Sequence, residues 1–286
     1  MTRALAAAAI AGIALAAAAD SAAQDEAAPP SYVYREVGNR QLRAFVSLPD
    51  DASPRRAAIL LFHGGGWKIG EPAWTFERAK QFAAKGLVAM SIEYRLSNDG
   101  LSPIDAVEDA CAAFAWARDQ ADRFGIDVRR VAGYGVSAGG HLVASAAMLP
   151  SVKERPIAGR ERPNALLLFS PALNMARDEY FRGLMAGHGK PASYSPAEFV
   201  RRDLPPTLVI QGEKDSVVRT DHARAFCAAA EMAGARCSIK VYPNVGHLLT
   251  RNLADQHKDF DSDPAGLADA RKREDAFLVS IGFARE

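Results

Sequence analysis

A serine lies between two glycines in the segment Gly135-Val-Ser-Ala-Gly139, which follows an apolar run and precedes a stretch of helix-forming residues. This spacing is typical of a nucleophile elbow, a tight strand-to-helix turn that holds the serine hydroxyl clear of the sheet. The flanking glycines relieve crowding at the turn because they have no Cβ. Chance alone produces such a pattern in roughly one chain in ten of this length. Ser137 is therefore a candidate nucleophile whose partners must be found elsewhere in the chain.

A second segment, His63-Gly-Gly-Gly-Trp67, directly follows an apolar run at 57–62. Acyl transfer develops negative charge on a carbonyl oxygen, and losing one preorganised donor to that oxygen typically costs about 3 to 4 kcal/mol of barrier. Three successive glycines let the backbone turn its amides toward such an oxyanion. We expect the donors to be the amides of Gly65, Gly66 and Ala138, and we expect His63 to order the loop by hydrogen bonding.

A serine hydroxyl is a weak nucleophile near neutral pH, so a base must take its proton and a carboxylate must hold that base in the correct tautomer. Asp215 follows the apolar run at 207–211, and His247 follows the run at 238–242. Each therefore lies in a loop at the carboxyl end of a predicted strand, where open α/β sheets gather their ligands. We expect Ser137, His247 and Asp215 to form a catalytic triad.

Other acids and histidines fit these roles less well. Glu213 lies closer to its strand end, and Asp221 has the position of a helix N-cap, so both stay as alternatives for the acid. The other histidines are His141, one turn into the helix after the serine, His222, at the start of a helix, and His188 and His257, in loops. No cysteine and histidine cluster has metal-ligand spacing, so no metal site is expected.

Short apolar runs alternate with helix-like stretches along the chain. Alternating polar and apolar residues predict an edge hairpin of strands at 32–37 and 42–48. The later runs are too continuous to have a solvent-exposed face, which suits central strands covered on both sides. These strands are expected at 57–62, 87–92, 131–134, 165–169, 207–211 and 238–242. Helices are expected between and after them, at 74–85, 103–124, 138–148, 221–233 and 264–281. This alternation predicts βαβ units and an α/β fold, with a mainly parallel central sheet and helices on both faces.

The connection at 172–203 breaks this rhythm, because it has no strong periodicity. Excursions of such length are often lids or binding loops, so we expect a short lid-like insertion. Trp67 is expected to wall the substrate pocket together with Tyr180, Phe181 and Tyr194 of the insertion, although ordinary packing explains these aromatic residues equally well. The polar segment at 250–263 is expected to be a solvated loop.

The composition suits one large domain, because 49% of the 286 residues are hydrophobic and 24% are charged. We expect this domain at 32–286, after a linker at 24–31. Arg3, an apolar stretch at 4–19 and small residues at 21–23 predict a secretory signal peptide at 1–23, and hence a periplasmic or secreted protein without stable membrane insertion. An uncleaved N-terminal anchor is the alternative.

The formal net charge of +1 excludes a strong electrostatic attraction to nucleic acid. Three cysteines are present. In an oxidising compartment Cys227 and Cys237 are able to pair, but their spacing alone leaves a disulfide open. Cys111 is expected to be a small buried residue of a helix.

With these residues in place, the chain resembles the α/β-hydrolase superfamily, whose order of serine, acid and histidine it shares. The two glycine-rich segments look like those of the hormone-sensitive-lipase-like and the acetyl-xylan or feruloyl esterase-like branches. Two further segments are similar to parts of such esterases, namely Glu93-Tyr-Arg-Leu96 with Pro103 and Asp109, where the arginine and aspartate are structural, and Tyr194-Ser-Pro196 leading into Leu204-Pro-Pro-Thr207. The resemblance begins at about residue 32. It implies the α/β-hydrolase fold and carboxylic-ester hydrolysis through an acyl-enzyme, with no cofactor.

The predicted function is that of a serine carboxylesterase, with a small-molecule or sugar ester as substrate. The large helical cap of many lipase-like members is missing, which favours short-chain or acetyl-type acyl groups. One alternative is a serine peptidase or amidase of the same fold, although related peptidases usually have an N-terminal propeller and lack the His-Gly-Gly-Gly run. The other is a catalytically silent binding protein. The alcohol group and the oligomeric state stay open.

Overall fold

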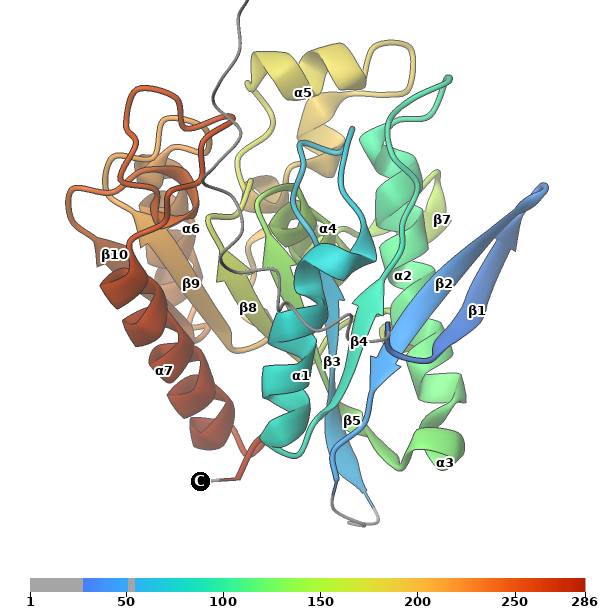
Figure 1. The fold of residues 1–286 in the computed structure, drawn as a ribbon. Helices are drawn as coiled ribbons and strands as arrows, with labels where there is room; N and C mark the ends of the chain where they lie inside the picture. Colours follow the sequence, from blue (N-terminus) through green and yellow to red (C-terminus); the bar gives the residue numbers. More distant parts are fainter. Residues whose placement is uncertain (1–27, 51–54, 286) are drawn as a thin grey trace, which may run out of the picture.

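The structure is a computed structural model that describes residues 28–50 and 55–285 (Figure 1). The predicted signal peptide at 1–23 and the first part of the predicted linker lie outside the described residues. Within them, eight strands form one sheet in the order β1-β2-β4-β3-β5-β8-β9-β10. The strands are β1 (Ser31–Val37), β2 (Arg40–Ser47), β3 (Arg56–Phe62), β4 (Val88–Ile92), β5 (Ile126–Val136), β8 (Ala165–Phe169), β9 (Thr207–Gly212) and β10 (Cys237–Tyr242).

The predicted mainly parallel α/β sheet is confirmed. Strands β4, β3, β5, β8, β9 and β10 pair in parallel, while β1 and β2 form the predicted antiparallel hairpin, and β2 joins β4 antiparallel. Parallel strands end at the same edge of a sheet, so the loops after β3, β5, β9 and β10 meet there. This edge is the top of the molecule in Figure 1.

Helices cover both faces of the sheet, as Figure 1 shows. The helices are α1 (Phe76–Ala84), α2 (Pro103–Asp119), α3 (Ala121–Phe124), α4 (Ala138–Met148), α5 (Glu179–Leu184), α6 (Thr220–Met232) and α7 (Pro264–Ser280). Successive residues of β3 alternate between the two apolar cores. Ala58, Leu60 and Phe62 face the core under α2, α4 and α6, whereas Ile59 and Leu61 face the core under α1 and α7. Burial on both faces explains the continuous apolar runs of these strands.

Several expected elements differ in detail. The single helix expected at 103–124 is two helices, because the chain leaves helical geometry at Gln120 and ends α3 at Gly125, whose φ of 67° suits glycine. The expected helix at 74–85 begins as a 3-10 turn, Pro72–Thr75, before α1. A small extra hairpin, β6 (Ser151–Val152) with β7 (Arg155–Pro156), follows α4.

The segment at 250–263 is not simply the solvated loop that its polarity predicts. Thr250 and Ser262 form an antiparallel bridge that closes the segment. Most of its side chains are exposed, but Thr250 and Gln256 are buried. The sequence-based expectation was wrong for these two residues because each finds hydrogen-bond partners inside the fold.

Cys227 of α6 and Cys237 of β10 form a disulfide, which resolves the pairing that spacing left open. Cys111 is buried and unpaired in α2, as expected. None of the helices in residues 28–50 and 55–285 has both the length and the apolarity to cross a membrane.

Candidate active site

Ser137 lies at the turn from β5 into α4, with φ of 53° and ψ of −115°. Such a conformation is costly for a residue with a side chain, and the surrounding structure must hold it in place. Gly139 permits the turn to come close to the neighbouring strand, because a Cβ there would lie 2.2 Å from the carbonyl oxygen of Phe62. The predicted elbow geometry is therefore present, and it ties the candidate nucleophile to the end of β3.

His247 and Asp215 lie beside Ser137 in a chain of hydrogen bonds. His247 Nε2 is 3.0 Å from Ser137 Oγ, and His247 Nδ1 is 2.9 Å from Asp215 Oδ2. A carboxylate only accepts hydrogen bonds, so Nδ1 carries the proton and Nε2 is left to accept from the serine hydroxyl. All three side chains are buried, with 8% of Ser137, 6% of Asp215 and 4% of His247 exposed.

Asp215 is held by donors on both of its oxygens. Its Oδ1 accepts from the backbone amides of Val217 and Val218 at 3.0 and 2.9 Å. Its Oδ2 accepts from Gln211 Nε2 at 2.8 Å as well as from His247. Hydrogen bonds of this kind stabilise the ionised carboxylate and fix its orientation toward the histidine.

The glycine loop after β3 leaves two backbone amides without an acceptor. His63 Nδ1 donates to the carbonyl of Gly64 at 2.6 Å, and the amides of Lys68 and Ile69 donate to the carbonyl of Gly65 at 3.1 Å. In a trans peptide the N–H points opposite to the C=O. Fixing the carbonyls of Gly64 and Gly65 therefore fixes the directions of the amides of Gly65 and Gly66.

Among the described residues, no group accepts a hydrogen bond from the amides of Gly65, Gly66 or Ala138. Ala138 is the first residue of α4, where helix amides have no partner within the helix. Unsatisfied donors next to a nucleophile are what an oxyanion hole requires. The geometry is thus compatible with the predicted donor set.

His63 is buried and neutral. Burial lowers its pKa to about 4, and the hydrogen bond to Gly64 opposes that shift. Tyr94 lies against the imidazole with ring centroids 4.3 Å apart, and its hydroxyl donates to the carbonyl of His63 at 2.9 Å. His63 therefore orders the glycine loop, as its sequence position predicts, and among the described residues its ring hydrogen-bonds to Gly64 and Tyr94 rather than to Ser137.

Trp67 joins the glycine loop to the helix after the serine. Its Nε1 donates to His141 Nδ1 at 3.3 Å, and His141 Nε2 donates to the carbonyl of Tyr194 at 2.7 Å. Burial lowers the pKa of His141 to about 4, so the ring is neutral and has one donor and one acceptor, as these bonds require. The Trp67 and Phe181 rings pack 5.2 Å apart.

The aromatic residues expected to wall the pocket differ in exposure. Trp67 and Phe181 are buried, with exposed fractions of 4% and 0%, whereas Tyr180 is 53% exposed. The Tyr180 hydroxyl donates to the carbonyl of Gly66 at 3.1 Å, which ties α5 of the insertion to the glycine loop. The pocket role of Trp67 stays a prediction, because its visible contacts are those of packing.

Among the described residues, none of the alternative acids and histidines forms a side-chain hydrogen bond with Ser137. Glu213 is paired with Lys214 on the surface, and Asp221 with Arg219 in the first turn of α6 rather than at its N-cap. His188 lines a separate cavity of about 600 Å³. Within the described part of the chain, no group of His, Cys, Asp and Glu residues is arranged to hold a metal ion.

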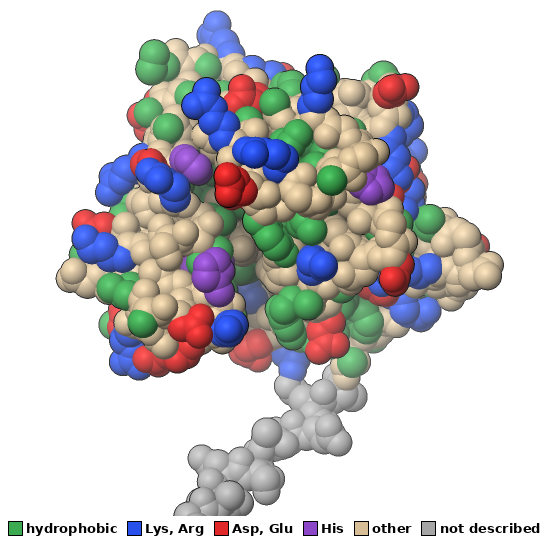
Figure 2. Space-filling model, turned by 90° about the horizontal axis from the view of Figure 1, so that it is seen from above, with side chains coloured by type: hydrophobic (Ala, Val, Ile, Leu, Met, Phe, Trp, Pro, Cys, Tyr) green, Lys and Arg blue, Asp and Glu red, His purple; other side chains and the backbone are tan. Residues whose placement is uncertain are grey.

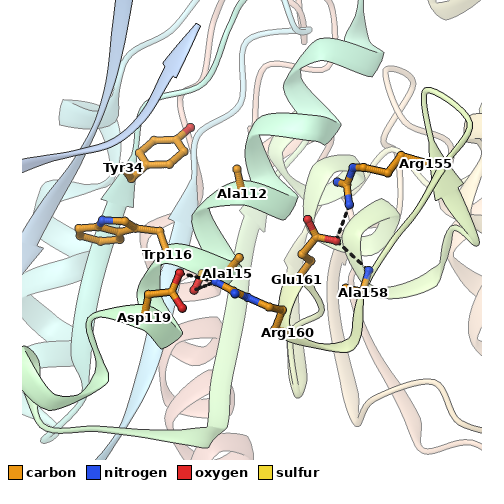
Figure 3. Close-up of a pocket in the computed structure, with 9 residues that line it drawn as sticks. All are labelled: Tyr34, Ala112, Ala115, Trp116, Asp119, Arg155, Ala158, Arg160 and Glu161. Atoms are coloured by element: carbon orange, nitrogen blue, oxygen red, sulfur yellow. Dashed lines mark hydrogen bonds and ion pairs between the residues drawn. The ribbon is translucent and has the colours of Figure 1, made fainter.

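A second cavity, of about 390 Å³, lies over α2 and contains none of the triad residues (Figure 3). Its ionic side chains are already paired, Arg155 with Glu161 at 2.9 Å and Arg160 with Asp119. By contrast, Figure 2 shows the face at the carboxyl ends of the strands, where hydrophobic side chains gather along a hollow. The loops that carry Ser137, Asp215 and His247 converge on this face, at the carboxyl ends of the strands.

Three residues of the site are not apparent from the sequence, namely Tyr94, Gln211 and Gln256. Gln211 is the penultimate residue of β9 and Tyr94 follows β4, so both are near strand ends. That position is a signal for functional residues, but it does not distinguish them from their neighbours. Gln256 lies in a polar loop that provides no such signal.

Comparison with known proteins places the chain in a family. A family model described as "alpha/beta hydrolase fold" matches residues 59–191. The chain is 28% identical over 254 residues to Esterase LipQ of Mycobacterium tuberculosis, covering 79% of this chain and 60% of that protein. It is 29% identical over 188 residues to an arylesterase of Saccharolobus solfataricus, covering 59% of this chain and 60% of that protein. The chain thus spans about 60% of the length of these curated relatives.

Among solved structures, apo esterase 2 of Thermogutta terrifontis matches with a TM-score of 0.80 and 32% identity, covering 91% of this chain and 97% of that chain. This chain therefore belongs to the α/β-hydrolase family. The relatives and the solved structure named here are esterases.

Proposed function

We propose that this protein is a carboxylic-ester hydrolase that acts through Ser137, His247 and Asp215. The Ser137 oxygen attacks the ester carbonyl while His247 Nε2 takes the hydroxyl proton, and the imidazolium then gives that proton to the leaving alcohol. Water repeats the cycle on the acyl-enzyme and releases the acid. Asp215 orients the imidazole and stabilises its charged form, and the amides of Gly65, Gly66 and Ala138 stabilise the oxyanion.

The observation that carries this proposal is the convergence of two features at one serine. Ser137 Oγ begins a hydrogen-bonded chain through His247 to Asp215, with distances of 3.0 and 2.9 Å. The unsatisfied amide of Ala138, the next residue, lies at the N-terminus of α4. Thermogutta terrifontis esterase 2 is further support, because it has been solved phosphoramylated by tabun and phosphonylated by sarin.

For the substrate, we propose esters with a short acyl group, of acetyl type or slightly longer. The insertion above the site contains one short α-helix, α5, and two 3-10 turns, and its Phe181 side chain is buried against Trp67. A lid of this size offers little surface for a long acyl chain. Thermogutta terrifontis esterase 2 has been solved with propionate and with butyrate bound, which supports the same choice.

We also propose that the protein is exported. The support is the sequence at 1–23, together with the Cys227–Cys237 disulfide, since disulfides persist in oxidising compartments. Mass spectrometry of the N-terminus of protein recovered from the expressing cells tests this directly. Exported protein that still begins at residue 1 would contradict cleavage of the signal peptide.

Labelling with a fluorophosphonate probe tests the triad proposal, because the probe reacts only with an activated serine. We expect wild-type protein to be labelled and Ser137→Ala to be inert, with equal folding of the two by circular dichroism. Equal labelling of the two proteins would refute the proposal. No labelling of either would favour the silent binding protein.

A series of p-nitrophenyl esters from acetate to octanoate tests the acyl group, and we expect kcat/KM to fall beyond butyrate. A maximum at octanoate would refute the short-chain proposal. Aminoacyl anilides serve as the comparison for peptidase or amidase activity, and a higher kcat/KM on them than on the esters would overturn the esterase assignment.

A further inference from the structure

Gln256 is a buried polar side chain in a loop whose other side chains are mostly solvated. Only 4% of it is exposed. Its Oε1 accepts from two backbone amides, that of His247 at 2.8 Å and that of Ser216 at 3.1 Å. Its Nε2 donates to the carbonyl of Lys214 at 2.9 Å. One side chain thus pairs with three backbone groups, and its bond to the His247 amide is fully buried, where an unpaired amide would be costly.

These backbone groups belong to the two catalytic loops. Lys214 and Ser216 flank Asp215 in the loop after β9, while His247 lies in the loop after β10. The amide side chain therefore bridges both loops from a third segment of the chain. The side chain leaves no room for a Cβ at Gly246, where that atom would lie 2.3 Å from the Gln256 amide. Close contact with the residue just before His247 shows that the bridge is tight.

The loop that carries His247 needs such support. Leu248 and Leu249 both have positive φ, 54° and 59°, which is unusual for residues with branched side chains. Backbone strain of this kind persists only when surrounding contacts over-determine it. Gln256 supplies one of those contacts at the amide of His247, directly before the strained pair.

We infer that Gln256 is a positioning residue for catalysis, which sets the imidazole of His247 against the carboxylate of Asp215 by clamping both loops. The inference rests on the proposed esterase function and goes beyond it, since Gln256 touches neither substrate nor reacting atoms. Its effect is on the geometry of proton transfer. Misplacement of about 1 Å in a catalytic group costs on the order of 100-fold in rate.

Two substitutions distinguish a role of the Gln256 hydrogen bonds from a role of the side-chain volume alone. Gln256→Met keeps the length of the side chain and removes both its acceptor and its donor. Gln256→Glu keeps the shape and, as a carboxylate, keeps the acceptor for the two backbone amides while it loses the donor to Lys214. We expect Gln256→Met to lower kcat about 10- to 100-fold with KM changed less than about threefold. We expect Gln256→Glu to recover most of that loss.

Rates are measured on p-nitrophenyl acetate and divided by the concentration of sites titrated with fluorophosphonate, so that misfolded protein does not count. A loss confined to melting temperature, with normal kcat per titrated site, would refute the positioning role. Equal losses for the Met and Glu variants would refute it too. If Gln256→Met does not fold, the Glu variant still decides, because a 100-fold loss there contradicts the inference.

A double variant gives the sharpest test. If Gln256 acts through the pairing of Asp215 with His247, its effect should largely vanish once Asp215→Asn has removed that pairing. We therefore expect that adding Gln256→Met to Asp215→Asn lowers kcat by less than about threefold. A general loosening of the site would cost the same factor in both backgrounds, which would overturn the inference. Labelling of wild type against Ser137→Ala tests the esterase function separately from this comparison.

Discussion

Replacing Asp215 with asparagine tests the tautomer argument most directly. The backbone amides of Val217 and Val218 both donate to Oδ1. An asparagine must keep its carbonyl oxygen toward these two donors, since its NH₂ group would clash with them. The NH₂ group then faces His247 Nδ1, where it donates to the ring and leaves the imidazole proton on Nε2.

That tautomer points an N–H at Ser137 Oγ in place of an acceptor, so the base is lost while the packing stays. Gln211 opposes this orientation with one donor at Oδ2, whereas Val217 and Val218 favour it with two donors at Oδ1. Gln211 Nε2 donates to both Asp215 Oδ2 and the carbonyl of Val218, at 2.8 and 3.0 Å. A flip of this amide to accept from the asparagine would turn its oxygen toward the Val218 carbonyl, which is unfavourable.

Loss of the correct tautomer typically costs about 10⁴-fold in turnover, or about 5 kcal/mol of barrier. We expect a loss of this order in kcat on p-nitrophenyl acetate at pH 7.5, with KM nearly unchanged. The melting temperature and far-ultraviolet circular dichroism of the variant serve as the folding control. A folded variant within about tenfold of the wild-type kcat would refute the tautomer reasoning and reopen the acid role for Glu213.

Three further predictions concern other parts of the fold. Tyr180→Phe removes the hydrogen bond to the Gly66 carbonyl and keeps the ring, so kcat should fall about 2- to 10-fold; an unchanged kcat would show that the glycine loop does not depend on α5. Replacing Cys227 and Cys237 by serine should lower the free energy of unfolding by about 2 to 3 kcal/mol in urea titrations and leave kcat unchanged, because the bond lies at the opposite end of β10 from His247. Burial lowers the pKa of His141 in the folded protein to about 4. As the pH falls from 6.5 toward 4, the unfolded chain therefore takes up this proton before the folded protein does. The free energy of unfolding that His141 contributes at pH 7 is lost over this range. His141→Asn should therefore flatten the dependence of unfolding free energy on pH by up to about 3 kcal/mol, and parallel curves for the two proteins would contradict this.

The strands were predictable because burial on both faces leaves a continuous apolar run. β8 spans Ala165–Phe169, as expected, and is buried throughout. β5 shows the limit of that signal. It begins at Ile126, five residues before the expected start, because the exposed Arg129 and the half-buried Arg130 carry no apolar pattern. Pairing with a neighbouring strand, which is a long-range property, decides such residues.

The motif residues of the site were also accessible, since each lies at a fixed place after a strand and has a side chain suited to one chemical task. Gln256 was not accessible. A glutamine in a polar, acid-rich segment is indistinguishable from a solvated one until the partners at Ser216 and His247 are known. Those partners come from other loops, and no local pattern in the sequence records the contact.

Glycines determine how closely the catalytic strands approach one another. A Cβ at Gly139 would lie 2.2 Å from the Phe62 carbonyl oxygen, and a Cβ at Gly212 would lie 2.1 Å from the Gly246 carbonyl oxygen. The first contact joins the nucleophile turn to the strand that ends at the glycine loop, and the second joins the acid loop to the histidine loop. An added methyl group must push one loop of either pair away, because in both cases the obstacle is backbone. Distances of 3.0 and 2.9 Å along the triad tolerate little of that movement. The same closeness that makes the triad possible thus makes it sensitive to a single methyl group at Gly139 or Gly212.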